Sequence, residues 1–426
     1  MKKYRLLAAL LTAAVILGSC GSSDSSSGTS ETAPADKEAT ETTAPAEDKP
    51  ASEENAPTVF IPEAKNTQEL ILEVDTDPSH RDKRFVETAD YAQLKETYKD
   101  KFYFGCAVSE RVMGNNEYTE LTVAQFNSYT AENAMKPDSG LDWKTAAKNP
   151  EFYKEHAPVN FNRFKNCLDY AQAHNMKVRG HTLVWHSQTP EEFFHVNYDK
   201  TSAFCDKELM LKRMENYIKD VLEWTNANYP GLIYAWDVVN EAIDDGSGMR
   251  KQSNWYKVVG EDFVAKAFEY ARKYAAPGVK LFYNDYNAYQ ARKQRDILKV
   301  IKPIAEAGNL DGVGMQSHLG LYLNPNDFMK AVKKYHDELG CEIHITELDV
   351  GNDKKKVDDW EKKQADFMTR FFTALQKTID EGVPVTSVTI WGLTDDMSWR
   401  QNEGALLFEM DLTKKPAFDA IIEAKK

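Results

Sequence analysis

The chain has 426 residues, with 53 Lys and Arg against 67 Asp and Glu, which gives a formal net charge of −14 at pH 7. Proteins that bind nucleic acid need a basic surface, so this balance argues against a nucleic-acid partner. The length is sufficient for a hydrophobic core that maintains the fold without disulfide bonds.

Residues 1–20 have the pattern of a bacterial export signal. A charged start is followed by an apolar stretch over residues 6–17, which is too short to span a bilayer. Leu17-Gly18-Ser19-Cys20 then resembles the bacterial lipoprotein signal, in which the cysteine is lipidated and becomes the new N-terminus. The pattern predicts a lipoprotein held on a membrane through Cys20, at the extracellular face of the cell. An ordinary cleaved signal with a chance cysteine, which would give a secreted protein, is the alternative.

Residues 21–66 are rich in Ser, Thr, Ala, Pro and Glu, and they contain no Leu. Such a segment cannot bury enough apolar surface to offset its ordering entropy, so we expect it to be disordered. Its ten acidic and three basic side chains favour an extended conformation. The segment is therefore predicted to be a linker that holds a folded domain off a membrane.

Four cysteines follow Cys20, namely Cys106, Cys167, Cys205 and Cys341, and there is no C-x-x-C pair. We expect the first and last of the four in strands and the other two in helices. An exported domain can form disulfides, but buried free thiols are at least as consistent with this sequence, so their pairing stays open. No zinc-ligand spacing and no calcium loop is visible, and we expect neither a metal nor a cofactor.

Residues 67–426 are predicted to form one domain, because no second low-complexity stretch divides them. Short apolar runs, typical of buried strands, alternate with longer amphipathic patterns, typical of helices. The runs are Phe102–Val108, Phe126–Ala131, Lys177–Trp185, Ile233–Asn240, Lys280–Asn284, Gly312–Ser317, Glu342–Thr346 and Val385–Trp391. The helical patterns include Asn162–His174, Leu209–Asn228, Phe263–Tyr274, Ala291–Gly308, Pro325–Leu339 and Val357–Glu381.

Eight strands that alternate with helices predict an α/β fold, a (β/α)₈ TIM barrel. A doubly wound open sheet is the alternative, but it usually carries a Gly-rich turn after its first strand, and the sequence has none.

Polar and aromatic residues gather where the apolar runs end. Glu241 directly follows the fourth run and Glu347 the seventh, so both carboxylates are expected at the mouth of the barrel. Asp349 lies two residues beyond Glu347 and shares its face if the strand continues that far. Two carboxylates at one mouth are the minimum equipment for cleaving a glycosidic bond.

Each of these residues also has an ordinary structural interpretation. A single glutamate at a strand end is often a helix cap or a surface charge, and His181, His186 and His318 could each be core histidines. Trp391 and Trp399 could be core aromatics, but tryptophan beside polar clusters also suits stacking against sugar rings. The clustering of all these groups at the ends of several strands favours catalysis and sugar binding.

Taken together, these strings resemble the family-10 glycoside hydrolases, the barrel xylanases. The matching strings are Phe104-Gly105-Cys106-Ala107-Val108, Thr130-Ala131-Glu132-Asn133-Ala134-Met135-Lys136-Pro137, Arg179-Gly180-His181-Thr182-Leu183-Val184-Trp185-His186-Ser187-Gln188, Trp236-Asp237-Val238-Val239-Asn240-Glu241, Tyr283-Asn284-Asp285-Tyr286-Asn287, Gly312-Val313-Gly314-Met315-Gln316-Ser317-His318, Ile345-Thr346-Glu347-Leu348-Asp349 and Trp391-Gly392-Leu393-Thr394-Asp395. The similarity runs from about residue 88 to the end of the chain, in the right order across all eight strands.

The resemblance implies hydrolysis of internal β-1,4 bonds of xylan with retention of configuration, with Glu241 as acid/base and Glu347 as nucleophile. It further implies that Asn240 holds the sugar 2-hydroxyl and that His318 bridges Glu347 and Asp349. Gln316 and His181 would border the reacting sugar, and the subsites on the non-reducing side would be formed by Glu132, Asn133, Lys136, Trp185, Trp391 and Trp399. A retaining mechanism needs the two carboxyls about 5–5.5 Å apart.

One departure from the family pattern concerns the loop after the third strand. Family members commonly show Gln-Thr-Pro, one residue and then Trp, whereas Glu192 occupies that position here. This leaves the catalytic residues intact and puts the contacts around the loop in doubt. Residues 67–87 precede the usual start of the family, and the sequence does not indicate whether they pack on the barrel.

Two alternative functions remain open at this point. Lipid-anchored exported proteins with Ser-rich tails are often solute receptors, but these have two lobes and no need for paired glutamates. The same barrel could also cleave β-1,4-glucan. The expected partners are xylan and xylo-oligosaccharides, together with a membrane through the lipidated Cys20, and a monomer is expected.

Overall fold

The computed structural model describes residues 82–246, 248–353 and 355–425, all of which belong to one unit. The predicted signal, Cys20 and the predicted linker lie outside these residues.

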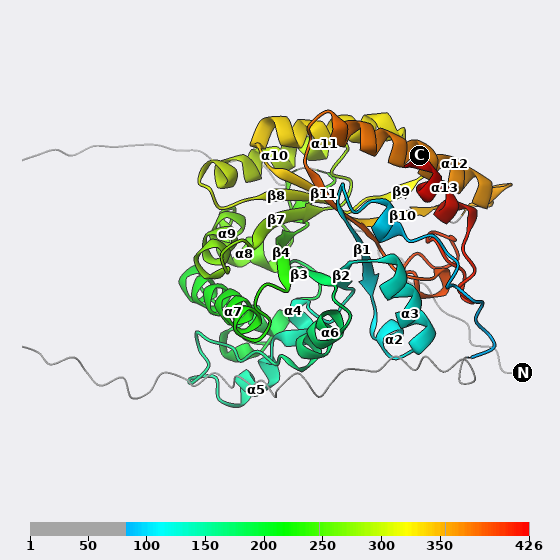
Figure 1. Ribbon diagram of the computed structural model, residues 1–426. Helices are drawn as coiled ribbons and strands as arrows, with labels where there is room; N and C mark the ends of the chain where they lie inside the picture. Colours follow the sequence, from blue (N-terminus) through cyan, green and yellow to red (C-terminus); the bar gives the residue numbers. More distant parts are fainter. Residues whose placement is uncertain (1–81, 247, 354, 426) are drawn as a thin grey trace, which may run out of the picture. The chain divides into compact units, whose positions relative to one another are not determined.

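Eight parallel strands form a closed ring at the centre of the fold (Figure 1). They are β1 (Tyr103–Val108), β2 (Ser128–Ala131), β3 (Lys177–Trp185), β4 (Ile233–Asn240), β7 (Lys280–Asp285), β8 (Gly312–Met315), β10 (Glu342–Gly351) and β11 (Val385–Ile390). The ring closes because β11 pairs with both β1 and β10. Outside it lie β9 (His318–Gly320), which pairs with β10, and a small hairpin of β5 (Ile243–Asp244) and β6 (Gly248–Met249).

Helices surround the ring, which confirms the predicted (β/α)₈ barrel (Figure 1). The longer ones are α3 (Asn116–Gln125), α6 (Asn162–Ala173), α7 (Lys207–Asn228), α9 (Phe263–Tyr274), α10 (Ala291–Glu306), α11 (Pro325–Leu339), α12 (Trp360–Asp380) and α13 (Pro416–Ala424). The short ones are α1 (Leu94–Thr97), α2 (Glu110–Met113), α4 (Pro137–Gly140), α5 (Trp143–Lys148) and α8 (Asn254–Val259), with 3₁₀ turns η2 (Glu191–Phe194), η3 (Val196–Tyr198) and η4 (Asp395–Met397). Within the described residues no helix is both long and apolar enough to cross a membrane.

Local backbone signals explain where helices begin earlier or later than predicted. α7 begins two residues before the predicted Leu209, because the Asp206 side chain accepts a hydrogen bond from the backbone N–H of that residue at 2.8 Å. α12 begins at Trp360 and not at Val357, because Asp359 has a left-handed backbone (φ +53°) that a helix cannot pass through.

Two strand ends at the mouth of the barrel differ from the prediction by more than one residue, and both differences matter for the site. β10 continues to Gly351, so Asp349 does share the face of Glu347. β8 ends at Met315, and a left-handed Ser317 (φ +71°) turns the chain into β9. His318 of β9 then pairs in register with Asp349.

All four cysteines of the described residues are buried and free, which settles the open question in favour of thiols. Two of the predicted placements are wrong. Cys205 precedes α7 and lies outside any helix, because that helix begins only after its Asp206 cap. Cys341 lies one residue before β10 and not within it.

Residues ahead of the first helix pack on the barrel. The Phe85 ring meets the Tyr118 ring edge-on at 5.1 Å, and the Val86 backbone N–H donates to the Asp411 carbonyl at 3.0 Å. Tyr91 stacks on Phe408 at 6.4 Å. The segment from residue 82 onward is therefore part of the folded domain.

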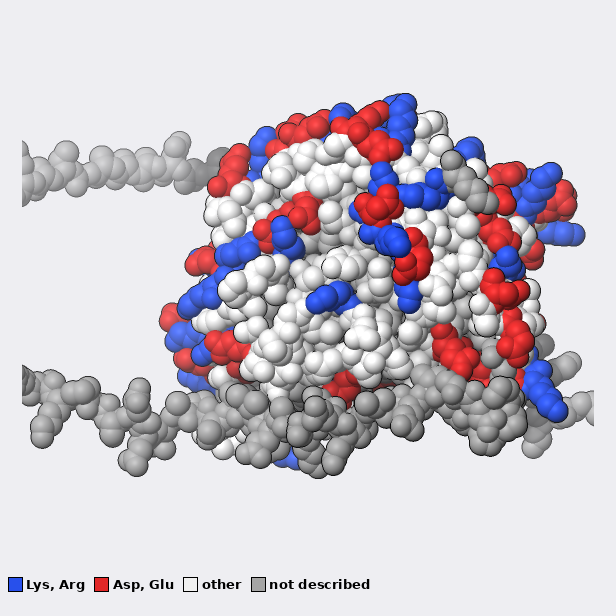
Figure 2. Space-filling model, viewed as in Figure 1, with Lys and Arg blue, Asp and Glu red and all other residues white. Residues whose placement is uncertain are grey.

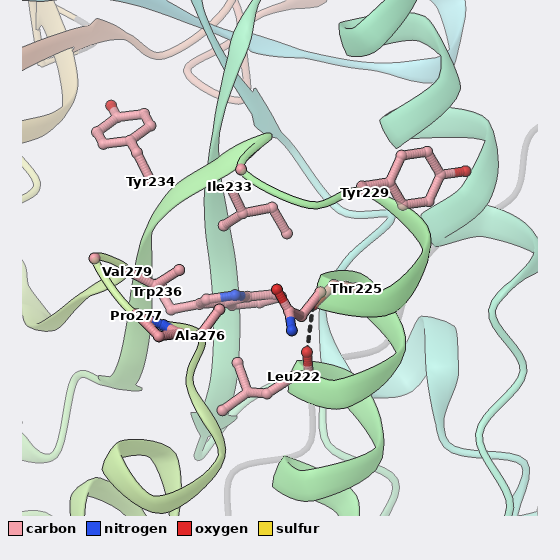
Figure 3. A pocket seen from close by; sticks show the side chains of 12 residues that line it. Leu222, Thr225, Tyr229, Ile233, Tyr234, Trp236, Ala276, Pro277 and Val279 are labelled. Atoms are coloured by element: carbon pink, nitrogen blue, oxygen red, sulfur yellow. Dashed lines mark hydrogen bonds between the residues drawn. The ribbon is translucent and has the colours of Figure 1, made fainter.

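A pocket of about 280 Å³ opens at the amino-terminal end of β4, between α7 and the chain that enters β7 (Figure 3). Its walls include Leu222, Ile233 and Trp236. The Trp236 ring fills space that only a glycine at position 180 leaves free, since a Cβ there would lie 2.3 Å from the ring. This end of a barrel serves stability, and catalysis belongs to the other end. On the face drawn in Figure 2, acidic and basic side chains are interspersed.

Candidate active site

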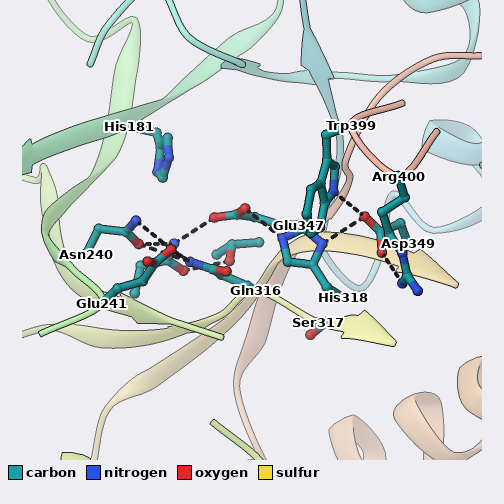
Figure 4. A network of polar contacts seen from close by, with 12 residues as sticks. His181, Asn240, Glu241, Gln316, Ser317, His318, Glu347, Asp349, Trp399 and Arg400 are labelled. Atoms are coloured by element: carbon teal, nitrogen blue, oxygen red, sulfur yellow. Dashed lines mark hydrogen bonds and ion pairs between the residues drawn. The ribbon is translucent and has the colours of Figure 1, made fainter. Parts of the chain in front are cut away.

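Glu241 and Glu347 meet at the mouth of the barrel, joined by a chain of side-chain amides (Figure 4). Asn284 donates one hydrogen bond to Glu347 Oε1 at 2.8 Å and another to Asn240 Oδ1 at 2.9 Å. Gln316 donates to the same Asn240 oxygen at 3.2 Å and to Glu241 Oε1 at 2.8 Å. These amides come from β4, β7 and the end of β8. Closure of the barrel therefore fixes the positions of the two carboxylates relative to each other.

Glu241 is held in a strained backbone conformation. Its φ is +57°, a left-handed value that costs a residue with a Cβ on the order of 1 kcal/mol. The backbone is fixed there by a hydrogen bond from its N–H to the Asn284 carbonyl at 2.9 Å and by Arg250, which donates to its carbonyl at 3.2 Å. Trp185 donates its indole N–H to Glu241 Oε2 at 3.0 Å. The strain aims this carboxylate into the mouth.

The groups that donate hydrogen bonds to the Glu241 carboxylate are uncharged. The hydrogen bonds that the structure gives it come from amides and an indole, Asn240, Gln316 and Trp185. His186 Nδ1 lies 3.9 Å from Glu241 Oε2. Burial, followed by the charge of Arg250, lowers the pKa of His186, so this imidazole is neutral at pH 7.

Glu347 has the opposite environment. Only 4% of it is exposed, and His318 Nε2 lies 3.2 Å from its Oε2. Burial by itself would raise the pKa of Glu347. The hydrogen bond from His318, the charges of His181 and His318, and the hydrogen bond from Asn284 together hold the pKa below its ordinary value. This carboxyl is therefore ionised at neutral pH.

The His318 imidazole is kept charged by two carboxylates. Its Nδ1 lies 2.7 Å from Asp349 Oδ2. Burial would lower the pKa of His318, but Asp349 and Glu347 raise it to about 10. Asp349 is in turn fixed by Arg400 at 3.0 Å and by the Trp399 indole N–H at 2.9 Å. Arg400, Asp349, His318 and Glu347 thus form a chain of alternating positive and negative charges that ends at Glu347.

His181 borders the same mouth from β3. Its Nδ1 lies 2.9 Å from Asp237 Oδ2, and Arg179 makes a two-pronged ion pair with the same carboxylate. Burial acts to raise the pKa of Asp237, but Arg179 and His181 hold it below its ordinary value. The fully buried Asp237 carboxylate fixes the orientation of the His181 ring.

The residues after β2 form a polar wall beside the carboxylates. Lys136 Nζ donates to Asn133 Oδ1 at 3.0 Å and to Gln188 Oε1 at 2.9 Å, and it lies 4.9 Å from the centre of the Trp185 ring. Burial lowers the pKa of Lys136, opposed by Glu347 and then by Glu132, and burial raises the pKa of Glu132. This wall offers donors and acceptors to several hydroxyl groups at once.

Two tryptophans after β11 lie over the histidines. Trp391 is 7% exposed, with its ring 5.5 Å from His181 and 6.4 Å from His318. Trp399 is 56% exposed, although its N–H is fixed on Asp349 and its ring meets His318 edge-on at 4.7 Å. An indole that is rigid yet exposed is a suitable platform for a pyranose face.

The structure brings every predicted site residue of the barrel to this mouth. It adds groups to which the sequence pattern assigned no role, among them Asn284, Asp237, Arg250 and Arg400. Asn284 ends an apolar run and Asp237 lies within one, so the sequence pattern could have indicated both. No local pattern indicates Arg250 or Arg400. Glu192, the departure from the family pattern, lies in η2. Within residues 82–425, leaving aside 247 and 354, no three His, Cys, Asp or Glu side chains converge as metal ligands.

Comparisons with known proteins agree with this geometry. The chain is 40% identical over 338 residues to endo-1,4-beta-xylanase B of Butyrivibrio fibrisolvens, covering 78% of this chain and 53% of that protein. It is 35% identical over 345 residues to exoglucanase XynX of Acetivibrio thermocellus, covering 79% and 30%. The chain thus spans about half or less of the length of these relatives.

A crystal structure of the intracellular xylanase TsXylA from Thermoanaerobacterium saccharolyticum, a mutant in complex with xylotriose, superposes with a TM-score of 0.70 at 35% identity. The alignment covers 78% of this chain and 99% of that one. The model of glycosyl hydrolase family 10 matches residues 93–424, well over half of the chain. The chain therefore belongs to glycosyl hydrolase family 10.

Proposed function

We propose that this protein is a retaining endo-1,4-β-xylanase that cleaves internal bonds of xylan by double displacement. The observation that carries the proposal is the contrast between the two carboxylates. Glu347 lies beside a charged imidazole and has a lowered pKa, whereas the groups that donate hydrogen bonds to Glu241 are uncharged. Opposite environments suit opposite protonation roles. Both carboxylates and all the proposed subsites come from one chain, and we propose that the enzyme acts as a monomer.

In the proposed first step, ionised Glu347 attacks the anomeric carbon while Glu241 gives its proton to the leaving glycosidic oxygen. A glycosyl ester forms on Glu347, and the leaving sugar departs with the proton. Glu241, now a carboxylate, takes a proton from water, and that water attacks the ester and frees Glu347. Both displacements invert the anomeric carbon, so the product retains its configuration.

The neighbouring groups hold the sugar during these steps. Asn240 is oriented by Asn284 and by Gln316, and we propose that it holds the 2-hydroxyl of the reacting sugar. His181 and Gln316 would border that sugar, while Glu132, Asn133, Lys136 and Trp185 would form the subsites on its non-reducing side. Trp391 and Trp399 would complete these subsites on the non-reducing side.

Product analysis tests the proposal against the β-1,4-glucan alternative, which the name of the relative exoglucanase XynX keeps open. The purified enzyme is expected to release xylo-oligosaccharides of mixed length from xylan. It should release little from cellulose or barley glucan, and the new reducing ends should be β-anomers by NMR. A higher rate on glucan than on xylan, or release of α-anomers, would contradict the proposal.

Asp349→Asn is expected to move the acid limb of the kcat/KM profile upward by about one pH unit. Without the Asp349 charge the pKa of His318 falls, and a less charged imidazole no longer holds down the pKa of Glu347. Glu347 must be ionised to attack, so activity disappears at a higher pH as the pH is lowered. The profile is measured with an aryl xylobioside.

Asp353→Asn is the matched control for this change. Asp353 also pairs with Arg400, at 3.3 Å, but neither of the hydrogen bonds of His318 goes to it. Its substitution should leave the acid limb in place. A downward shift in Asp349→Asn, or equal shifts in both variants, would show that His318 does not tune Glu347.

We also propose that the protein is exported and anchored at the outer side of a membrane through a lipidated Cys20. Leu17-Gly18-Ser19-Cys20 and the acidic segment after it support this proposal. Cys20→Ser is expected to release active enzyme into the medium or to block its processing, because the diacyl group that anchors such a protein would be lost. Fractionation and mass spectrometry of the N-terminus measure this. Soluble wild-type enzyme with an unmodified N-terminus beyond residue 20 would refute the anchor.

A further inference from the structure

A basic pocket of about 550 Å³ lies outside the active site, between the β5–β6 hairpin, the start of α9 and the first half of α10. We call it the α10 pocket. Cations lining it are Lys251, Arg292, Arg295 and Lys299. Two acids, Glu261 and Asp296, and an apolar surface of Met249, Ala265 and Val300 complete it.

Three of the four cations of the α10 pocket have no ion-pair partner among the described residues. Lys251, Arg292 and Lys299 make no ion pair with any other residue that the structure describes, and Arg295 pairs only with its neighbour Asp296. The first turn of α10 contains no acidic residue. Cations at a helix N-terminus oppose the helix dipole and destabilise it. In a chain of net charge −14, such a cluster is consistent with an external anion.

The α10 pocket is joined to the active site through the hairpin. The chain runs from Glu241 directly into β5 and returns through β6 to Arg250 and Lys251. Arg250 reaches inward to the Glu241 carbonyl at 3.2 Å, whereas the next residue, Lys251, lines the pocket on the other side. Lys293 of α10 braces the hairpin at Asp245, 3.1 Å away. A chain bound in the mouth can therefore have its substituents close to this pocket.

We propose that the α10 pocket binds the uronic acid side groups of acidic xylan, outside the catalytic cleft. This inference rests on the proposed function. The cations would pair with the uronate carboxylate, Glu261 and Asp296 would accept hydrogen bonds from its hydroxyls, and the apolar surface would meet a sugar face. A patch for an anionic membrane fits less well, because it needs cations alone, and the two acids would be repelled.

The test compares wild type with a variant in which Lys251, Arg292 and Lys299 are all changed to Gln. Substrates are glucuronoxylan and the same polymer after chemical reduction of its carboxyl groups. The variant should show a KM for glucuronoxylan about five- to thirtyfold higher at low salt, with kcat unchanged. The KM for the reduced polymer should not change. The difference in KM for glucuronoxylan between the two proteins should decrease at 0.5 M NaCl, because salt screens exposed charges.

The matched control changes Lys333, Lys334 and Lys363 to Gln, which removes the same charge from exposed positions on α11 and α12. It should keep the wild-type KM for both polymers. Equal losses in both triple variants would reduce the effect to net charge and overturn the proposal. Loss of binding to anionic phospholipid vesicles with an unchanged KM for glucuronoxylan would overturn it in favour of a membrane surface.

Binding is also measured without turnover, by the retardation of catalytically inactive Glu347→Ala protein in gels that contain glucuronoxylan. The triple substitution in that background should abolish the extra retardation that the acidic polymer gives over the reduced one. If the wild-type enzyme hydrolysed neither polymer, the proposed function would be wrong. This binding assay would still show whether the α10 pocket binds the acidic polymer. Equal retardation with and without the three cations would refute the site.

Discussion

Glu347→Ala is expected to lower kcat on xylan on the order of 10⁵-fold, because no covalent intermediate can form without the nucleophile. Azide can enter the space that the carboxylate leaves and attack the anomeric carbon from the same side. It should partly restore turnover and yield a glycosyl azide of inverted anomeric configuration. Rates are measured with an aryl xylobioside, and NMR identifies the product.

Glu117→Ala is the control for loss of a buried glutamate. Glu117 is 7% exposed and accepts a hydrogen bond from the Asp82 backbone N–H at 2.7 Å, on α3 and away from the two carboxylates. It should retain wild-type turnover, and azide should not stimulate it. Near-wild-type activity in Glu347→Ala, or an azide product of retained configuration, would remove Glu347 from the nucleophile role.

The barrel itself could be predicted from the sequence because its strands are buried on both faces. Such strands are continuous apolar runs, and a polar residue at the end of a run marks the mouth. For this reason the pattern of apolar runs is enough to indicate Glu241 and Glu347 as residues of the mouth. The prediction missed strand ends by only one to five residues, at places such as Ser317, where a single left-handed residue stops pairing.

The contacts between strands could not be predicted in the same way. Arg400 follows Asp349 by 51 residues, and nothing near it in sequence indicates that it fixes this carboxylate. Asn284 is visible as a strand end, but its double contact to Asn240 and Glu347 depends on the register of closed strands. The α10 pocket was equally hidden, since Lys251 meets the three cations of α10 only when that helix packs against the hairpin.

Glu241→Ala is expected to lower the rate much more for substrates with poor leaving groups than for substrates with good ones. Hydrolysis of xylan, whose leaving sugar needs a proton, should slow about 10²- to 10⁴-fold. Formation of the glycosyl ester from a dinitrophenyl xylobioside, whose leaving group departs as a stable anion, should slow less than about tenfold. Pre-steady-state release of dinitrophenol measures this step apart from the hydrolysis of the ester.

Glu241→Gln separates the lost proton from the lost volume, because the amide fills the space of the carboxyl group and its oxygen can still accept from either Trp185 or Gln316. It should show the same division between substrates as Glu241→Ala. In both variants the ester should accumulate, since no base remains to activate water, and azide should discharge it. That product is expected to have retained configuration, because azide then makes the second of two inversions, the opposite of its product with Glu347→Ala. Equal losses on both substrates, or an inverted azide product, would assign the proton transfer to another residue.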